Sequence, residues 1–187
     1  MEAIMLANIA VGFLESSSIA KGIEACDAMV KMAGVKLVKT SVVARGKYII
    51  LINGPVGEVE SAMRAGREML GKTLIDEVLI RNVHNQVVGA LDKRVPVEVL
   101  GAIGIIETKE AIAAVLAADA AAKAASVHLI EVKTVVGGGK GYVALCGAVG
   151  DVRTAVAAGI NAVKKELIVS HVVIPQADPQ LLASVGK

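Results

Sequence analysis

Two short glycine- and lysine-containing segments are the residues of this chain best suited to chemistry. They are Ala44-Arg45-Gly46-Lys47 and Gly137-Gly138-Gly139-Lys140. Glycine followed by lysine is typical of loops that bind phosphate, but the Walker pattern fails here. The Walker pattern requires a glycine six residues before the lysine, but Thr134 occupies that position before Lys140. It also requires Ser or Thr directly after the lysine, but Gly141 follows Lys140. A regulatory domain that binds a small ligand or nucleotide through Lys47 or Lys140 remains an alternative.

Other chemistry finds little support in the sequence. The three histidines, His84, His128 and His171, have no metal-ligand spacing, so we expect no metal. Cys26 and Cys146 form no CxxC pair, which favours a reducing cytosol. No Ser-His-Asp or paired-carboxylate pattern recurs, and we therefore expect a protein that is not an enzyme.

The chain contains an internal repeat. Gly12 and Gly104, Asp27 and Asp119, and Lys31 and Lys123 are pairwise 92 residues apart, and Lys47 and Lys140 are 93 apart. A period this long exceeds the roughly 20–50 residues of solenoid repeats, so it indicates two whole domains in tandem. We place them at residues 1–94 and 95–187, with Asp92–Glu98 as the linker.

Each copy predicts the same order of elements. An apolar strand (4–14 in the first copy, 99–106 in the second) precedes a helix. Ser17 or Ser18 caps this helix in the first copy, and in the second copy the helix is alanine-rich over 111–125. Two β-branched strands joined by a glycine loop (35–43 and 48–52; 127–136 and 142–146) then predict an antiparallel hairpin. A second helix, a final strand (77–80 or 169–174) and a short amphipathic tail follow. The order β-α-β-β-α-β predicts an α+β, ferredoxin-like fold.

Composition limits the class of partner. Apolar residues are 55% of the chain, aromatic residues 2%, and the net charge is +2. Nucleic-acid platforms need aromatic stacking or a basic face, so we expect no nucleic-acid partner. Charged residues interrupt every apolar run below the ~18–20 residues of a membrane helix, and we expect neither a membrane span nor a signal peptide. The excess of apolar residues instead favours an oligomer interface.

The repeated motifs resemble those of bacterial microcompartment shell proteins. They are Gly-x-(Leu/Ile)-Glu-(Ser/Thr), Asp-Ala-x-x-Lys, a glycine loop, and Gly-x-Val-Gly-(Glu/Asp)-Val, present at residues 12–16, 27–31, 44–47 and 54–59 and again at 104–108, 119–123, 137–140 and 147–152. Two copies in unpermuted order are similar to the tandem-domain type, such as that of propanediol-utilisation compartments. The resemblance implies a trimer that mimics a hexamer and packs side by side with other shell proteins. Together they would form a shell in the cytoplasm that encloses enzymes.

The resemblance also implies roles for particular residues. The glycine loops, which are otherwise ordinary hairpin turns, would surround a central pore (Val43, Ala44, Arg45, Gly46, Gly137, Gly138 and Gly139). Three copies of Arg45 there would favour polar or anionic metabolites. Lys31 and Lys123 would lie at the tile edges, although i,i+4 pairs with Asp27 and Asp119 are the simpler interpretation.

A third hypothesis is electron transfer. The cluster-bearing relative has a pore cysteine just before its Gly-Lys, and Ala44 is the residue of this chain that aligns with that cysteine. An iron–sulfur cluster requires thiolates, so we expect no cofactor.

Overall fold

The computed structural model describes residues 9–136, 139–183 and 185 and resolves two compact units, which divide between Val83 and His84. We expected the division between residues 94 and 95. It falls earlier because the helix that follows the first copy, α3 (Asn85–Asp92), packs against elements of the second unit. Part of the expected linker belongs there too, since the Val95 N–H donates to the Ile130 carbonyl at 2.8 Å.

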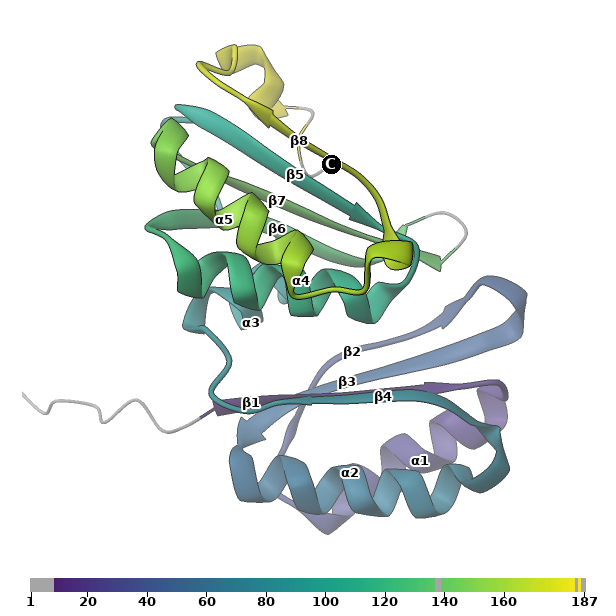
Figure 1. Cartoon of the computed structure of the whole chain (residues 1–187). Helices are drawn as coiled ribbons and strands as arrows, with labels where there is room; N and C mark the ends of the chain where they lie inside the picture. The colour runs from purple at the N-terminus through teal and green to yellow at the C-terminus, as the bar shows by residue number, and fades with distance from the viewer. Residues whose placement is uncertain (1–8, 137–138, 184, 186–187) are drawn as a thin grey trace, which may run out of the picture. The chain divides into compact units, whose positions relative to one another are not determined.

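The first unit has the predicted order of strands and helices. It consists of β1 (Ile9–Ser16), α1 (Ile19–Met32), β2 (Lys36–Val43), β3 (Lys47–Pro55), α2 (Val56–Leu70) and β4 (Leu74–Ile80). The strands pair antiparallel in the order β2-β3-β1-β4, and both helices cover one face of the sheet (Figure 1). This is the ferredoxin-like arrangement expected from the sequence. Residues 4–8 of the expected first strand lie outside the described residues.

The second unit repeats this arrangement. Its elements are β5 (Ala102–Thr108), α4 (Ala111–Ala124), β6 (Val127–Val136), β7 (Lys140–Gly147), α5 (Val149–Asn161) and β8 (Ile168–Ile174), with sheet order β6-β7-β5-β8 (Figure 1). A short turn, η5 (Pro179–Ala183), follows β8. Among the described residues, no helix is both long and apolar enough to cross a bilayer.

The repeated sequence features have structural causes. Ser18 caps α1, since its side chain accepts a hydrogen bond from the Lys21 N–H at 3.3 Å. Gly12 lies where α2 crosses β1, and a Cβ there would meet the Met63 sulfur at 2.8 Å. A Cβ on the repeat partner Gly104 would meet a methyl group of Val156 at 2.6 Å. Both glycines therefore allow the second helix of their unit to pack directly on the central strand.

Candidate functional site: the two hairpin turns

The turn between β2 and β3 is the most distinctive backbone of the first unit. Val43 and Lys47 are the last paired residues, and Ala44–Gly46 form a three-residue turn. Arg45 and Gly46 have φ angles of 63° and 70°, the left-handed region. A glycine adopts this conformation without penalty, whereas a residue such as arginine does so at a cost of about 1 kcal/mol. Arg45 is exposed and has no ion-pair partner within the described chain.

The equivalent turn joins β6 and β7. Val136 and Lys140 are its closing pair, and Gly139 has a φ of 88°. The predicted pore residues Gly137 and Gly138 lie outside the described residues. Both loops are therefore hairpin turns, as predicted. Their sequences differ, because the first contains an arginine and the second contains three glycines.

Each turn is followed by an ion pair that sequence reasoning did not identify. Lys47 Nζ lies 2.9 Å from Glu15 Oε1, and Lys140 Nζ lies 2.7 Å from Glu107 Oε1. The carboxylates come from the ends of β1 and β5. The signal was available, because both members of the pair recur in the repeat. Since these lysines already have partners, the structure gives no support to a phosphate site at Lys47 or Lys140.

The predicted i,i+4 pairs on the first helix of each unit are present. Lys31 Nζ lies 2.6 Å from Asp27 Oδ2, and Lys123 Nζ lies 2.6 Å from Asp119 Oδ2. Their surroundings differ, since the Asp27 side chain is 59% exposed and that of Asp119 only 11%. Asp119 also accepts a hydrogen bond from the His84 backbone N–H at 2.8 Å.

The cysteines are poorly placed to hold a cluster. Cys26 lies within α1 and Cys146 within β7, and both are buried. Burial raises the pKa of the Cys26 thiol to about 11, against a smaller lowering by the hydrogen bond with Tyr48, and burial also raises the pKa of Cys146. The turn Val43–Gly46 offers no thiol, so the residues present do not fit a thiolate-bound cluster. No group of three His, Cys, Asp or Glu side chains suited to a metal occurs in the part of the chain that the structure describes.

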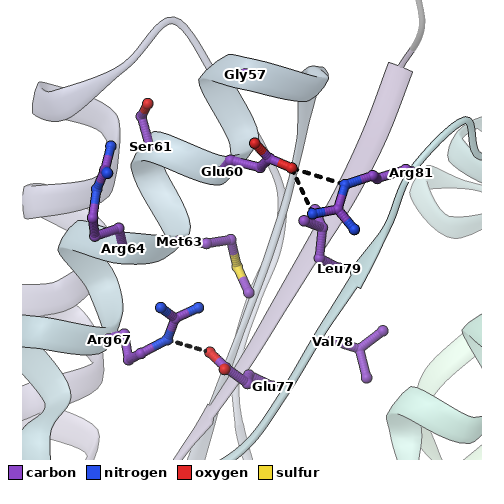
Figure 2. A pocket seen from close by; sticks show the side chains of 10 residues that line it. All are labelled: Gly57, Glu60, Ser61, Met63, Arg64, Arg67, Glu77, Val78, Leu79 and Arg81. Carbon is purple, nitrogen blue, oxygen red and sulfur yellow. Dashed lines mark hydrogen bonds and ion pairs between the residues drawn. The ribbon is translucent and has the colours of Figure 1, made fainter.

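The first unit also has a groove between α2 and β4, with a volume of about 580 Å³ (Figure 2). Two ion pairs span it: Arg67 Nε lies 2.8 Å from Glu77 Oε2, and Arg81 Nη2 lies 2.7 Å from Glu60 Oε1. The second unit has a groove of about 650 Å³ beside α5 and β8, lined by residues such as Ile160 and His171. Sequence reasoning missed both, because their residues are brought together only by the packing of helix on sheet.

Comparison with known proteins identifies this arrangement. The family model described as the BMC domain matches twice, at residues 10–83 and 102–177, and the chain therefore belongs to the BMC-domain family of bacterial microcompartment shell proteins, with two domains in tandem. This confirms the resemblance and the fold expected from the repeated motifs.

Individual relatives agree with this assignment. The chain is 40% identical over 169 residues to the bacterial microcompartment shell protein PduT of Citrobacter freundii, covering 89% of this chain and 92% of the relative. It is 38% identical over 89 residues to the major carboxysome shell protein CsoS1A of Halothiobacillus neapolitanus, covering 46% of this chain and 91% of the relative. The crystal structure of a microcompartment protein from Desulfitobacterium hafniense superposes with a TM-score of 0.89 at 42% identity, over 94% of this chain and 98% of that one.

Proposed function

We propose that the chain is a non-enzymatic subunit of a bacterial microcompartment shell that forms a flat homotrimer. Three chains supply six similar units around one axis, and the two hairpin turns of each chain surround a central pore for polar or anionic metabolites. The observation that carries the proposal is that two BMC domains, each with an exposed or glycine-rich turn at the same place in its sheet, lie on one chain.

Arg45 supports the pore role. Its backbone is in a conformation that glycine would adopt at lower cost, and its guanidinium is left without a partner among the described residues. A strained residue retained at a turn is a reasonable candidate for a functional one. Around a threefold axis, three such guanidinium groups would create a positive field at the opening and favour anions.

Exposed apolar side chains support the assembly. Ile23, Met32 and Val42 are 54%, 60% and 52% exposed in the first unit. We propose that these side chains lie at contacts between chains, since contiguous apolar surface is typical of interaction sites. We further propose that Lys31 and Lys123 lie at the edges of the tile, where they contact neighbouring trimers and other shell proteins. Encapsulated enzymes are a further class of partner.

The mass of the protein in solution tests the assembly. Sedimentation equilibrium should give three times the 19.1 kDa chain mass, and electron micrographs of concentrated protein should show hexagonally packed sheets. A chain that remains monomeric at high concentration contradicts the proposal, whatever the state of its turns.

Substitution of Arg45 tests the pore. Arg45→Glu should reverse the preference of assembled shells between an anionic and a cationic dye of equal size, and Arg45→Gly should abolish it without loss of stability. Arg153→Glu makes the same charge change on the exposed side of α5 and is the matched control. Unchanged dye preference in both Arg45 variants, with intact trimers, would mean that the turns do not line the route.

A further inference from the structure

The tail of the first copy covers an edge strand of the second unit. The side-chain amide of Gln86, in α3, donates to the Val127 carbonyl at 3.0 Å and accepts from the Leu129 N–H at 2.8 Å. It thus satisfies the outer edge of β6 as a neighbouring strand would. Val87 and Leu91 of α3 are buried, and α3 packs against both β6 and α4.

The tail of the second copy carries the same recognition residues. Val11 pairs with Ile80 and its repeat partner Ile103 pairs with Ile174, so the residues that follow these strands correspond with an offset of 94. Gln180 therefore corresponds to Gln86, and Leu181 to Val87. The cap is also repeated, since the Gln86 N–H donates to His84 Nδ1 at 3.4 Å and the Gln180 N–H to Asp178 Oδ1 at 2.8 Å.

The first unit has the matching edge strand. Leu37 pairs with Ile52 as Leu129 pairs with Leu145, and both strands have a bulge just after this residue. The Val35 N–H donates to the Ala33 carbonyl at 2.8 Å, and the Val127 N–H donates to the Ala125 carbonyl at 3.0 Å. This shared geometry turns the Val35 carbonyl and the Leu37 N–H toward the outer edge of the sheet.

This edge is uncovered in the single chain. Leu37 is 39% exposed, whereas Leu129 is 1% exposed. On the preceding helix, Ile23 is 54% exposed, whereas its repeat partner Val115 is fully buried. The tail of the second copy does not cover this edge of β2, because its Leu181 packs against a cluster of its own unit that includes Val97 and Leu100.

We propose that the exposed residues Asp178–Gln180 of one protomer dock on the β2 and α1 face of the first unit of a second copy of this chain. The Gln180 amide pairs with the Val35 carbonyl and the Leu37 N–H of that copy, as Gln86 pairs with Val127 and Leu129. Each unit then covers the next one around a closed ring, which is a head-to-tail contact. The inference rests on the proposed trimer and supplies the contact that closes it.

Paired cysteines test this contact. In the variant Gln180→Cys with Leu37→Cys, mild oxidation should give covalent dimers and trimers on non-reducing electrophoresis. The matched pair Gln86→Cys with Leu129→Cys should give a cross-link within one chain and shows that the geometry permits a disulfide. The single variants control for reaction of Cys26 and Cys146, which are buried.

The outcomes are distinguishable. A trimeric mass without the interchain cross-link, when the matched pair does cross-link, overturns the docking and leaves the proposed function standing. A 180–37 cross-link within one chain also overturns it. A monomer overturns the proposed function itself.

A variant without new cysteines gives an independent measure. Gln180→Ala should weaken each of the three contacts about tenfold, equal to about 1.4 kcal/mol, because two hydrogen bonds are lost at each contact, so the constant for dissociation of the trimer into three chains should rise about a thousandfold. Gln176→Ala, an exposed glutamine outside the docking segment, should leave it unchanged. An unaltered dissociation constant in Gln180→Ala would contradict the proposed pairing.

Discussion

Two residues have exchanged sizes between the copies. In the first unit, Gly22 of α1 faces Tyr48 of β3 so closely that a Cβ on Gly22 would lie 2.8 Å from the Tyr48 Cβ. In the second unit, Ala114 replaces Gly22, and Gly141 takes the place of Tyr48, opposite Thr108 as Tyr48 is opposite Ser16. The sequence does not reveal this exchange, because the small and large partners lie far apart in the chain.

We expect Gly22→Ala to destabilise the first unit by about 1–3 kcal/mol, since the added methyl group overpacks against the ring and Cβ of Tyr48. Thermal unfolding measures the loss. Gly57→Ala in α2 is the control, because nothing lies within 4 Å of its added Cβ. Alanine is the better helix former, so the control should be as stable as the original chain or more so. Equal melting temperatures for the two variants would contradict this account.

The strand-end ion pairs should differ in strength. The Glu15 side chain is 14% exposed and that of Glu107 is 36% exposed. Lys47→Met leaves the more buried carboxylate without its cation and should cost about 1–3 kcal/mol of unfolding free energy, whereas Lys140→Met should cost less than about 1 kcal/mol. Urea unfolding of the two variants measures the difference. A larger loss for Lys140→Met would show that the exposed fractions do not govern the pairs.

At the scale of elements, the sequence predicts most of the fold. Alternation of β-branched residues around a glycine loop predicts both hairpins, and β6 begins and ends as expected. Local sequence patterns do not determine which elements pack together. The sequence therefore predicted an amphipathic tail at Val83–Leu91 but not the unit against which it packs. The burial of Val87 and Leu91 and the side-chain pairing of Gln86 make that choice.

We expect Gln86→Ala to expose the outer edge of β6. The Leu129 N–H and the Val127 carbonyl lose their side-chain partner, so the amide of Leu129 should exchange with deuterium about fivefold faster, which corresponds to the ~1 kcal/mol of a typical hydrogen bond. Hydrogen exchange measured at single residues checks this. Asn85→Ala alters an exposed neighbour on α3 and should leave the rate unchanged. The same rate for Leu129 in both variants would show that Gln86 does not protect it.

For the whole molecule, composition predicts an oligomer interface from the excess of apolar residues, and several large apolar side chains are exposed in the single chain. Composition did not show where the exposed apolar side chains lie, because equivalent residues of the two sequence repeats have different neighbours in the structure. Ile23 and Val115 occupy equivalent positions, but one is 54% exposed and the other is fully buried. The pore and edge roles of the turns and lysines depend on other chains, and they remain predictions.

We expect Lys31→Ala to prevent the packing of trimers into sheets while leaving the stability of the chain almost unchanged. Its pair with Asp27 is exposed on both sides, so the free energy of unfolding should change by less than about 0.5 kcal/mol, while the sheets seen by electron microscopy should be lost. Lys123→Ala should cost more stability, because Asp119 is 11% exposed and also accepts the His84 N–H. Sheets that persist in both variants would remove these lysines from the tile edge.

The unequal turns of the two units have a consequence for how such a protein changes over time. In a ring of six identical subunits, one substitution changes six positions around the opening, because every subunit carries it. In the proposed trimer, a substitution at Arg45 changes three positions while the glycines after Val136 stay as they are. Fusion of two genes would thus allow finer adjustment of charge and width at the opening, with one half of the ring free to vary while the other preserves its shape.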